Sequence, residues 1–282
     1  MSITSAFRPP PGVAILMYHE VADRPEMGAL AGHIQGGYIL LREDFERQMA
    51  FLATAGFQSA SLQQLHDWSQ LGAPLPARPV VITFDDGYGG NYRHAFPILE
   101  RYGLSATFFI ISNRIGTLHM LSWEALREMQ RHGMAIGSHT ANHPLLSTLD
   151  EDRTRDELVG SKRAIEDRLG SPVGFLSLPN GDSNPFYVSV AQGAGYLGGC
   201  GSRFGFNTRS TERYFWNRQA IKQGVPLARF RNLLERRPAT VLYYTLQATA
   251  KQAIARTVGK ETYDRIYNRV FGVRSQDPSD PQ

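Results

Sequence analysis

The sequence predicts an α/β protein in which parallel strands alternate with helices. Short apolar segments rich in β-branched and aromatic residues recur along the chain, and longer segments with apolar residues at helical spacing separate them. Several of the longer segments begin with Ser, Asp or Asn, the residue types that cap helices. Strands that alternate with helices in this way usually pair in parallel. At 282 residues, the chain is long enough for two domains or for a single α/β barrel.

The expected elements follow in chain order. Seven strands are predicted, at residues 13–18, 80–84, 106–111, 134–138, 173–178, 197–202 and 215–221. Helices are predicted between them, at residues 42–55, 91–102, 122–132, 150–169 and 185–194. From about residue 226 only helical patterns remain. Loops at the carboxyl ends of parallel strands carry the chemistry in such folds, so residues directly after each strand are the first candidates for a site.

The composition excludes several classes of protein. Hydrophobic residues make up 42% of the chain and charged residues 20%, so it can bury a core and is not disordered, except for the tail at 275–282. The single cysteine, Cys200, allows neither an internal disulfide nor a cysteine zinc cluster, and we expect a small buried thiol. The 30 basic residues exceed the 26 acidic ones by only four, which does not predict a nucleic-acid partner.

The sequence also bears on location. No segment approaches the roughly 18 apolar residues of a transmembrane helix. The first twenty residues lack the apolar stretch and cleavage pattern of a secretory signal, so we expect a cytoplasmic protein. A signal or anchor removed before residue 1 would leave the same sequence.

Residues 226–274 are locally basic, with ten Lys and Arg residues against three Asp and Glu residues. Two interpretations remain. The segment is either a helical cap with a solvated charged face, or a surface that approaches anionic lipid or a phosphate-bearing substrate.

Two adjacent carboxylates, Asp85 and Asp86, follow the predicted strand 80–84 directly. Adjacent strand residues point in opposite directions, so the two carboxylates serve one centre only if each has a separate role or the loop turns them together. Asp-Gly is also an ordinary turn dipeptide, so the pair alone does not establish a site.

Two histidines, His139 and His143, follow the predicted strand 134–138. Pro144 disfavours a helix at His143, and we therefore expect a turn. A lone histidine is usually structural, but two at this spacing, together with a spare carboxylate, favour a divalent metal site. Three protein ligands would leave an open position for water.

These segments resemble a known family. Ile82-Thr83-Phe84-Asp85-Asp86-Gly87-Tyr88 and His139-Thr140-Ala141-Asn142-His143-Pro144 are similar to the first two motifs of the polysaccharide deacetylases, carbohydrate esterase family 4, whose domain is also named after chitooligosaccharide deacetylase. The likeness covers roughly residues 10–225. It implies a distorted (β/α) barrel of about seven strands at 1–225, followed by a basic helical extension at 226–274 and a disordered tail at 275–282.

The resemblance also implies residue roles. One divalent ion, most simply Zn²⁺, would be held by Asp86, His139 and His143, and Asp85 would be the general base. A bound zinc ion can lower the pKa of water to about 7. The water would attack an N-acetyl carbonyl of an amino sugar in a glycan or in its lipid-linked precursor.

The third family motif, of the type Arg-x-Pro-Tyr-Gly, is altered here to Ser177-Leu178-Pro179-Asn180-Gly181. The Asn180 N–H would still donate to the oxyanion, but Ser177 stands where the arginine is expected. Arg218, on the last predicted strand, is the proposed replacement, because an arginine occurs there in the exopolysaccharide branch of the family. The alternative is a surface arginine at the exposed end of that strand.

The fifth family motif brings a C-terminal histidine that protonates the leaving amine, and this chain has no histidine after His143. His19, after the first strand, is expected to supply this proton. The alternative is a structural histidine at the barrel mouth. Tyr88 and Trp123 lie near loop ends where they could contact a sugar, although core packing explains each of them equally well.

We therefore expect a metal-dependent N-deacetylase acting on a glycan or a lipid-linked sugar. A catalytically silent carbohydrate-binding relative is one alternative, suggested by the two altered motifs, and a deformylase or amide hydrolase on a lipid-linked sugar is another. Retention of both Asp85 and Asp86 favours the enzyme. Peripheral contact with the inner face of the cytoplasmic membrane is also expected, and no particular oligomeric state is predicted.

Overall fold

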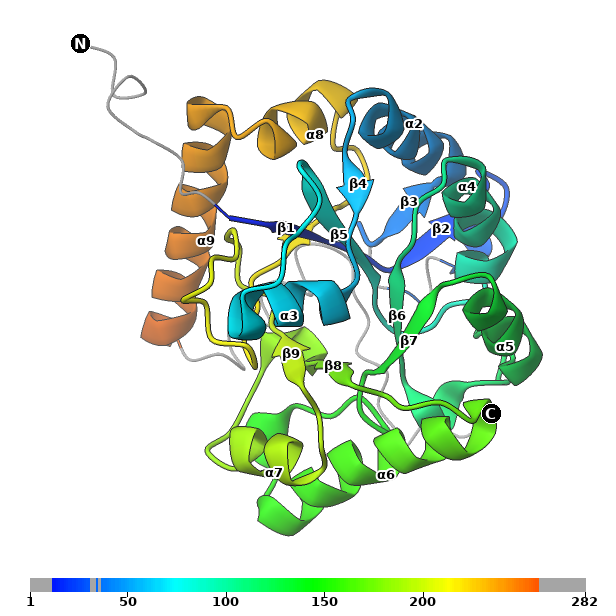
Figure 1. Cartoon of the computed structure of the whole chain (residues 1–282), viewed down its shortest axis with the longest axis vertical. Helices are drawn as coiled ribbons and strands as arrows, with labels where there is room; N and C mark the ends of the chain where they lie inside the picture. Colours follow the sequence, from blue (N-terminus) through cyan, green and yellow to red (C-terminus); the bar gives the residue numbers. More distant parts are fainter. Residues whose placement is uncertain (1–11, 31–33, 35–36, 259–282) are drawn as a thin grey trace.

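The main sheet is parallel and curled. The computed structural model describes residues 12–30, 34 and 37–258. Figure 1 shows a central sheet surrounded by helices. The strand order is β10-β1-β5-β6-β7-β8-β9, and every neighbouring pair is parallel. The bounds are β1 Ala14–Tyr18, β5 Pro79–Phe84, β6 Thr107–Ile110, β7 Ala135–Ser138, β8 Phe175–Ser177, β9 Gly198–Cys200 and β10 Gln219–Ala220. All seven expected strands are present.

The two ends of this sheet approach each other. Cys200 in β9 forms a parallel bridge with Trp216, just before β10, and the Arg218 N–H donates to the Arg203 carbonyl over 2.9 Å. The sheet is therefore a distorted barrel, as expected. A short strand, β4 at Gln58–Ser59, extends it beside β5, and β2 at Glu20–Ala22 pairs with β3 at Ile39–Leu41 in a separate small sheet.

Helices connect the strands on the outside of the barrel. The five predicted between the strands are present, and α4 is preceded by a π-helical turn at Asn91–Ala95. Two helices, α1 and α3, were not predicted. The bounds are α1 Met27–Leu30, α2 Arg42–Thr54, α3 Leu62–Leu71, α4 Phe96–Arg101, α5 Trp123–Arg131, α6 Glu151–Leu169, α7 Tyr187–Gly193, α8 Leu227–Leu234 and α9 Pro238–Val258.

Alternation along β5 decides which side chains enter the barrel. Val81 packs with the interior cluster, which includes Ile15 and Trp216, and α3 adds Leu65 to that cluster. Phe84 instead packs in the larger cluster that includes side chains of the surrounding helices. Strand residues alternate between faces, so the side chain of Asp85, four residues after Val81, points into the barrel interior. It is 2% exposed.

The helices after residue 225 begin as part of the main core. Phe230, Leu233 and Leu234 of α8, and Val241 of α9, are buried in the same large cluster as residues of α2. Residues 259–282, which contain the predicted tail at 275–282, lie outside the described residues.

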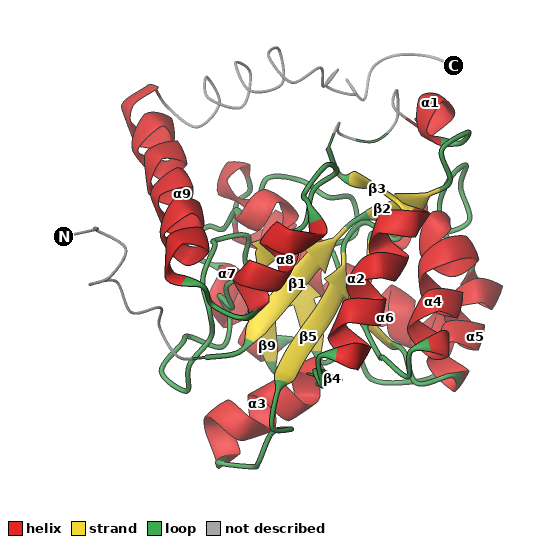
Figure 2. Cartoon of the chain, turned by 90° about the horizontal axis from the view of Figure 1, so that it is seen from above, coloured by secondary structure: helices red, strands yellow, loops and turns green. Residues whose placement is uncertain are grey.

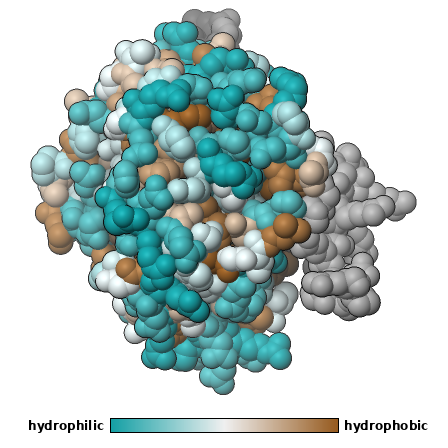
Figure 3. Space-filling view, turned by 90° about the vertical axis from the view of Figure 1, so that its right-hand side faces the viewer, coloured by the Kyte–Doolittle hydropathy of each residue, from teal (hydrophilic) through white to brown (hydrophobic). Residues whose placement is uncertain are grey.

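The outer surface over α4 and α5 is mainly hydrophilic, with scattered apolar side chains, as Figure 3 shows for that side of the molecule. Among the described residues, no helix combines the length and apolar character needed to cross a bilayer.

Candidate metal centre and active site

A left-handed turn brings Asp86 back toward the barrel mouth. Asp86 has a φ of 74° and Gly87 one of 83°, so the chain reverses immediately after Asp85. Left-handed φ values are uncommon for residues other than glycine, and Asp and Asn tolerate them best. Because of this turn, the adjacent carboxylates of Asp85 and Asp86 both face one centre.

A second tight turn carries the two histidines. Thr140 and His143 both have a φ of 65°, and the His143 N–H donates to Thr140 Oγ1 over 2.9 Å. The Glu157 carboxylate, from α6, accepts hydrogen bonds from the Ala141 and Asn142 N–H groups, each over 2.9 Å. The turn expected from Pro144 is therefore present, and α6 anchors it.

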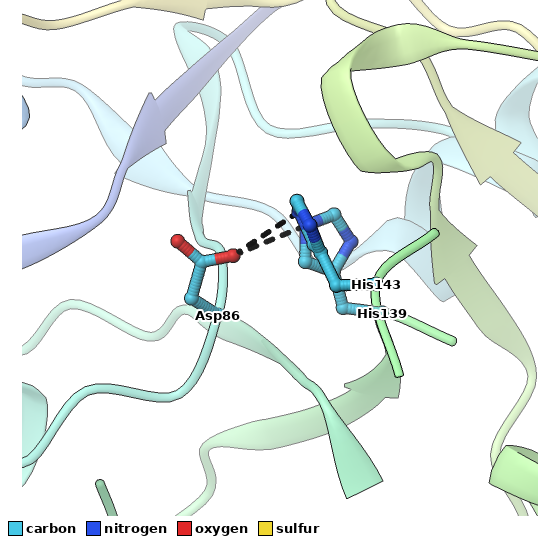
Figure 4. Close-up of side chains that lie close together, drawn as sticks. All are labelled: Asp86, His139 and His143. Atoms are coloured by element: carbon cyan, nitrogen blue, oxygen red, sulfur yellow. Dashed lines mark ion pairs between the residues drawn. The ribbon is translucent and has the colours of Figure 1, made fainter. Parts of the chain in front are cut away.

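Asp86, His139 and His143 converge at the carboxyl ends of β5 and β7, as Figure 4 shows. Asp86 Oδ1 lies 3.4 Å from His139 Nε2 and 3.6 Å from His143 Nε2, and one ligand atom from each residue lies within 4.8 Å of the others. Ligands of a tetrahedral zinc ion at about 2.0–2.1 Å are separated by about 3.3–3.4 Å. The spacing therefore suits a small divalent ion.

Hydrogen bonding orients His139 toward the cluster. His139 Nδ1 lies 2.8 Å from the Ser177 carbonyl oxygen, which can only accept a hydrogen bond, so Nδ1 carries a proton and Nε2 is the ring atom that faces Asp86. Burial lowers the pKa of His139, but Asp85 and Asp86 outweigh it and raise that pKa above its ordinary value. Burial, with help from neighbouring His139, lowers the pKa of His143 to about 4. Burial raises the pKa of Asp86, but the histidines outweigh it and hold that pKa far below its usual range.

Asp85 is held by Arg218 deep in the barrel. The Arg218 Nη1 and Nη2 atoms donate to Asp85 Oδ1 and Oδ2, each over 2.7 Å, and the arginine is 1% exposed. The alternative of a surface arginine on the last strand is therefore wrong. Burial raises the pKa of Asp85, but Arg218, His139 and His19 together outweigh burial and hold that pKa below its ordinary value.

Ser177 completes this pair. Its hydroxyl accepts a hydrogen bond from Arg218 Nη2 over 2.8 Å and donates to Asp85 Oδ2 over 3.1 Å. Sequence reasoning noted Ser177 only as a departure from the family pattern and missed this contact. Its position at the carboxyl end of β8, one strand from β7, is the signal that could have found it.

His19 lies beside the same charges. It is the residue after β1, and the charges of Asp85, Asp86 and Arg218 all act on its imidazole, although burial is the largest effect and lowers its pKa. Within the described part of the chain, its buried Nδ1 atom has no hydrogen-bond partner, and its ring lies 4.2 Å from that of Tyr38, centroid to centroid.

The three other predicted residues lie in different surroundings. Tyr88 is close to Asp86, and burial, followed by that carboxylate, raises the pKa of its phenol. Asn180 is exposed in a short turn after β8, with a φ of 54°. Trp123 begins α5, and its ring contacts the Arg168 guanidinium at 5.7 Å from centroid to Cζ. The structure thus brings Tyr88 to the cluster, while the Trp123 ring contacts α6. Their roles toward a sugar remain predictions.

Comparison with known proteins agrees with this site. A family model described as polysaccharide deacetylase matches residues 72–198. YxkH of Bacillus subtilis (strain 168), named as a polysaccharide deacetylase, is 29% identical over 226 residues, which are 80% of this chain and 77% of that protein. The peptidoglycan-N-acetylglucosamine deacetylase of Bacillus cereus is 31% identical over 124 residues, 44% of this chain and 56% of that enzyme.

A solved structure extends the likeness to the fold. Streptococcus pyogenes deacetylase PplD, in complex with acetate, superimposes with a TM-score of 0.72 at 26% identity, over 80% of this chain and 98% of that one. Fold, site and comparisons together define a hydrolase of the carbohydrate esterase class. The chain belongs to the polysaccharide deacetylase family.

Proposed function

We propose that this protein is a Zn²⁺-dependent hydrolase that removes the N-acetyl group from an amino sugar in a glycan or its lipid-linked precursor. The observation that carries the proposal is the separation of two carboxylates. Asp86 belongs to the Asp/His/His cluster, whereas Asp85 lies 4.0 Å from His139 Nε2 and pairs with Arg218 instead. One carboxylate is thus available as a ligand and the other as a base.

The comparisons support the substrate class. The B. cereus relative is named for deacetylation of N-acetylglucosamine in peptidoglycan, and the PplD structure contains acetate, the product that such a reaction releases. An N-acetylated glycan is therefore the substrate we propose for this chain.

The residues of the chain then have distinct tasks. A divalent ion held by Asp86, His139 and His143 would supply Lewis-acid chemistry toward a water and the acetyl carbonyl. Asp85 takes the proton of the attacking water. Arg218 and Ser177 hold the Asp85 carboxylate in place, and because Arg218 keeps its pKa low, this carboxylate is ionised at neutral pH.

His19 is the proposed proton donor to the departing amine. Amine expulsion needs a proton in the transition state, and the buried Nδ1 of His19 has no hydrogen-bond partner among the residues that the structure describes. The Asn91 side chain donates to the His19 carbonyl over 2.6 Å and fixes the backbone at this position. The Asn180 N–H is the proposed donor to the oxyanion.

The test is product release from a panel of N-acetylated glycans and lipid-linked sugars, with and without a chelator. We expect acetate release that the chelator abolishes and that added Zn²⁺ restores. Asp85→Asn serves as the matched control, because it preserves the shape of the site. Binding of the same glycans without release of acetate would support the silent carbohydrate-binding relative, and release of formate instead would support the deformylase.

A further inference from the structure

The second half of α9 lies largely outside the packed core. Val241 is buried and Tyr244 packs against the core, but from Thr245 to Ile254 the described side chains, apart from Ala248, are exposed. Figure 2 shows this half of α9 standing clear of the barrel. Its stability therefore owes little to the core, and its exposed face needs an explanation.

That free face is apolar. Tyr243, Leu246 and Ile254 are 48%, 60% and 50% exposed, and steps of three and eight residues place them on one face of a helix. We call these three residues the α9 stripe. The other large apolar side chains exposed in the described chain lie far apart in sequence: Leu71 ends α3, and Leu118 and Phe186 lie in turns.

The segment that carries the α9 stripe is basic in sequence. The helix itself contains no Asp or Glu, and the segment 226–258 has one acidic residue, Glu235, against six basic ones. The Arg229 guanidinium lies 5.3 Å from the centre of the Tyr243 ring, so a cation directly adjoins the stripe. The basic residues of the segment are Arg229, Arg231, Arg236, Arg237, Lys251 and Arg256.

We propose that α8 and α9 form a docking surface for an anionic lipid bilayer, with the α9 stripe entering the headgroup region. Helices that lie in a membrane interface combine an apolar face with flanking Lys and Arg and a Tyr or Trp. A second copy of the chain is a poorer occupant, because two such helices would bring like charges together without an acidic partner on either helix.

The direction of α9 gives this surface a consequence for the site. In Figure 2 the arrowheads of β1 and β5 point to the upper side, and the carboxyl end of α9 rises on that same side. An interfacial helix lies flat in the membrane, so docking along the α9 stripe would set the strands roughly along the bilayer surface, with the Asp/His/His cluster at one end of the barrel. The docking surface itself does not depend on the proposed function.

Vesicle flotation of the full chain tests the proposal. The probes are phosphatidylcholine vesicles with or without phosphatidylglycerol, at low and high salt. We expect binding only to the anionic vesicles, weakened by salt because exposed charges are screened. Leu246→Glu should weaken this binding by about tenfold, since it places in the α9 stripe a negative charge, which the anionic headgroups repel. Leu71→Glu is the matched control, because it makes the same change at an exposed leucine, 74% exposed, on α3.

Several results would overturn the proposal: no binding to anionic vesicles, equal binding to neutral ones, or equal loss in both variants. A dimer that dissociates in Leu246→Glu, without any vesicle binding, would assign the stripe to self-association instead. Acetate release from a soluble glycan should be the same in both variants and the wild type, which shows that each folds. If the wild type and both variants release no acetate but vesicle binding is intact, the result would contradict only the proposed function and not the docking surface.

Discussion

Two groups of histidines and carboxylates in this protein look alike by composition and differ in surroundings. In each, one ligand atom per residue lies within 4.8 Å of the others. The mouth cluster consists of Asp86, His139 and His143, and the outer cluster, beside β2 and the start of α4, consists of Asp23, Glu26 and His94.

The outer cluster is already neutralised by arginines. Arg42 Nε lies 2.5 Å from Asp23 Oδ1, and Arg93 Nη2 lies 3.4 Å from Glu26 Oε1. His94 Nε2 takes the other Glu26 oxygen at 2.7 Å. All three residues of the cluster are partly exposed. These carboxylates have cationic partners, so a metal ion would have to displace them.

The mouth cluster lacks such cations. Within the described residues, the ion-pair partners of Asp86 are the two histidines only, and the buried arginine nearby is paired with Asp85. A buried carboxylate needs compensating charge. The neighbouring cations, more than the types of ligand, therefore decide which of the two clusters suits a metal ion.

The largest expected effect is on metal binding at the mouth cluster. Asp86→Asn removes its negative charge, and we expect no bound metal by elemental analysis after dialysis. Asp23→Asn, the same change in the outer cluster, should leave one metal per chain. Full occupancy in a His139→Ala, His143→Ala double variant would show that the metal binds elsewhere.

The next effect separates the base from the ligands. Asp85→Asn should keep the metal and lower turnover by about two to four orders of magnitude, the usual scale for a general base. The paired measurements are metal content and the rate of acetate release. Near-normal turnover would mean that another group deprotonates the water.

A smaller loss of turnover is expected at His19. His19→Ala should impair acetate release by about 10²-fold, the lower end of general acid catalysis, with metal content unchanged. Because burial lowers the pKa of His19, the donor should lose its proton below the ordinary histidine pKa of about 6.5. The wild-type rate should therefore fall as the pH rises through that range, and the variant should lack this fall. Wild-type rates on a substrate with a poor leaving amine would make His19 structural.

Much of the barrel was predictable because its signals are local. The apolar periodicity located all seven main strands, and the sequence around Pro144 predicted the turn that places His143. Helix α3 was missed although its amino end carries a capping box, in which Ser61 accepts from the Gln64 N–H and the Gln64 side chain accepts from the Ser61 N–H. The sequence therefore contains a local signal for the start of α3.

The contacts inside the barrel could not be predicted in the same way. Arg218 and Asp85 are 133 residues apart and meet only because β10 pairs with β1 beside β5. Sequence reasoning suggested Arg218 from a resemblance, but the Ser177 hydroxyl between the two charges depends on sheet order. The left-handed φ of Asp86 likewise follows from the tertiary position of the loop, although Asp-Gly permits it.

The smallest expected effect completes the comparison of the two clusters. His94→Ala removes the histidine of the outer cluster. The equivalent loss at His139 is expected to abolish metal binding at the mouth cluster. Because Arg93 and Arg42 still neutralise Glu26 and Asp23, we expect unchanged metal content and turnover. Loss of the partly exposed His94–Glu26 pair should lower the free energy of unfolding by at most about 1 kcal/mol, the scale of such ion pairs. Denaturant unfolding measures this change, and a loss of one metal per chain would show that the outer cluster is a metal site after all.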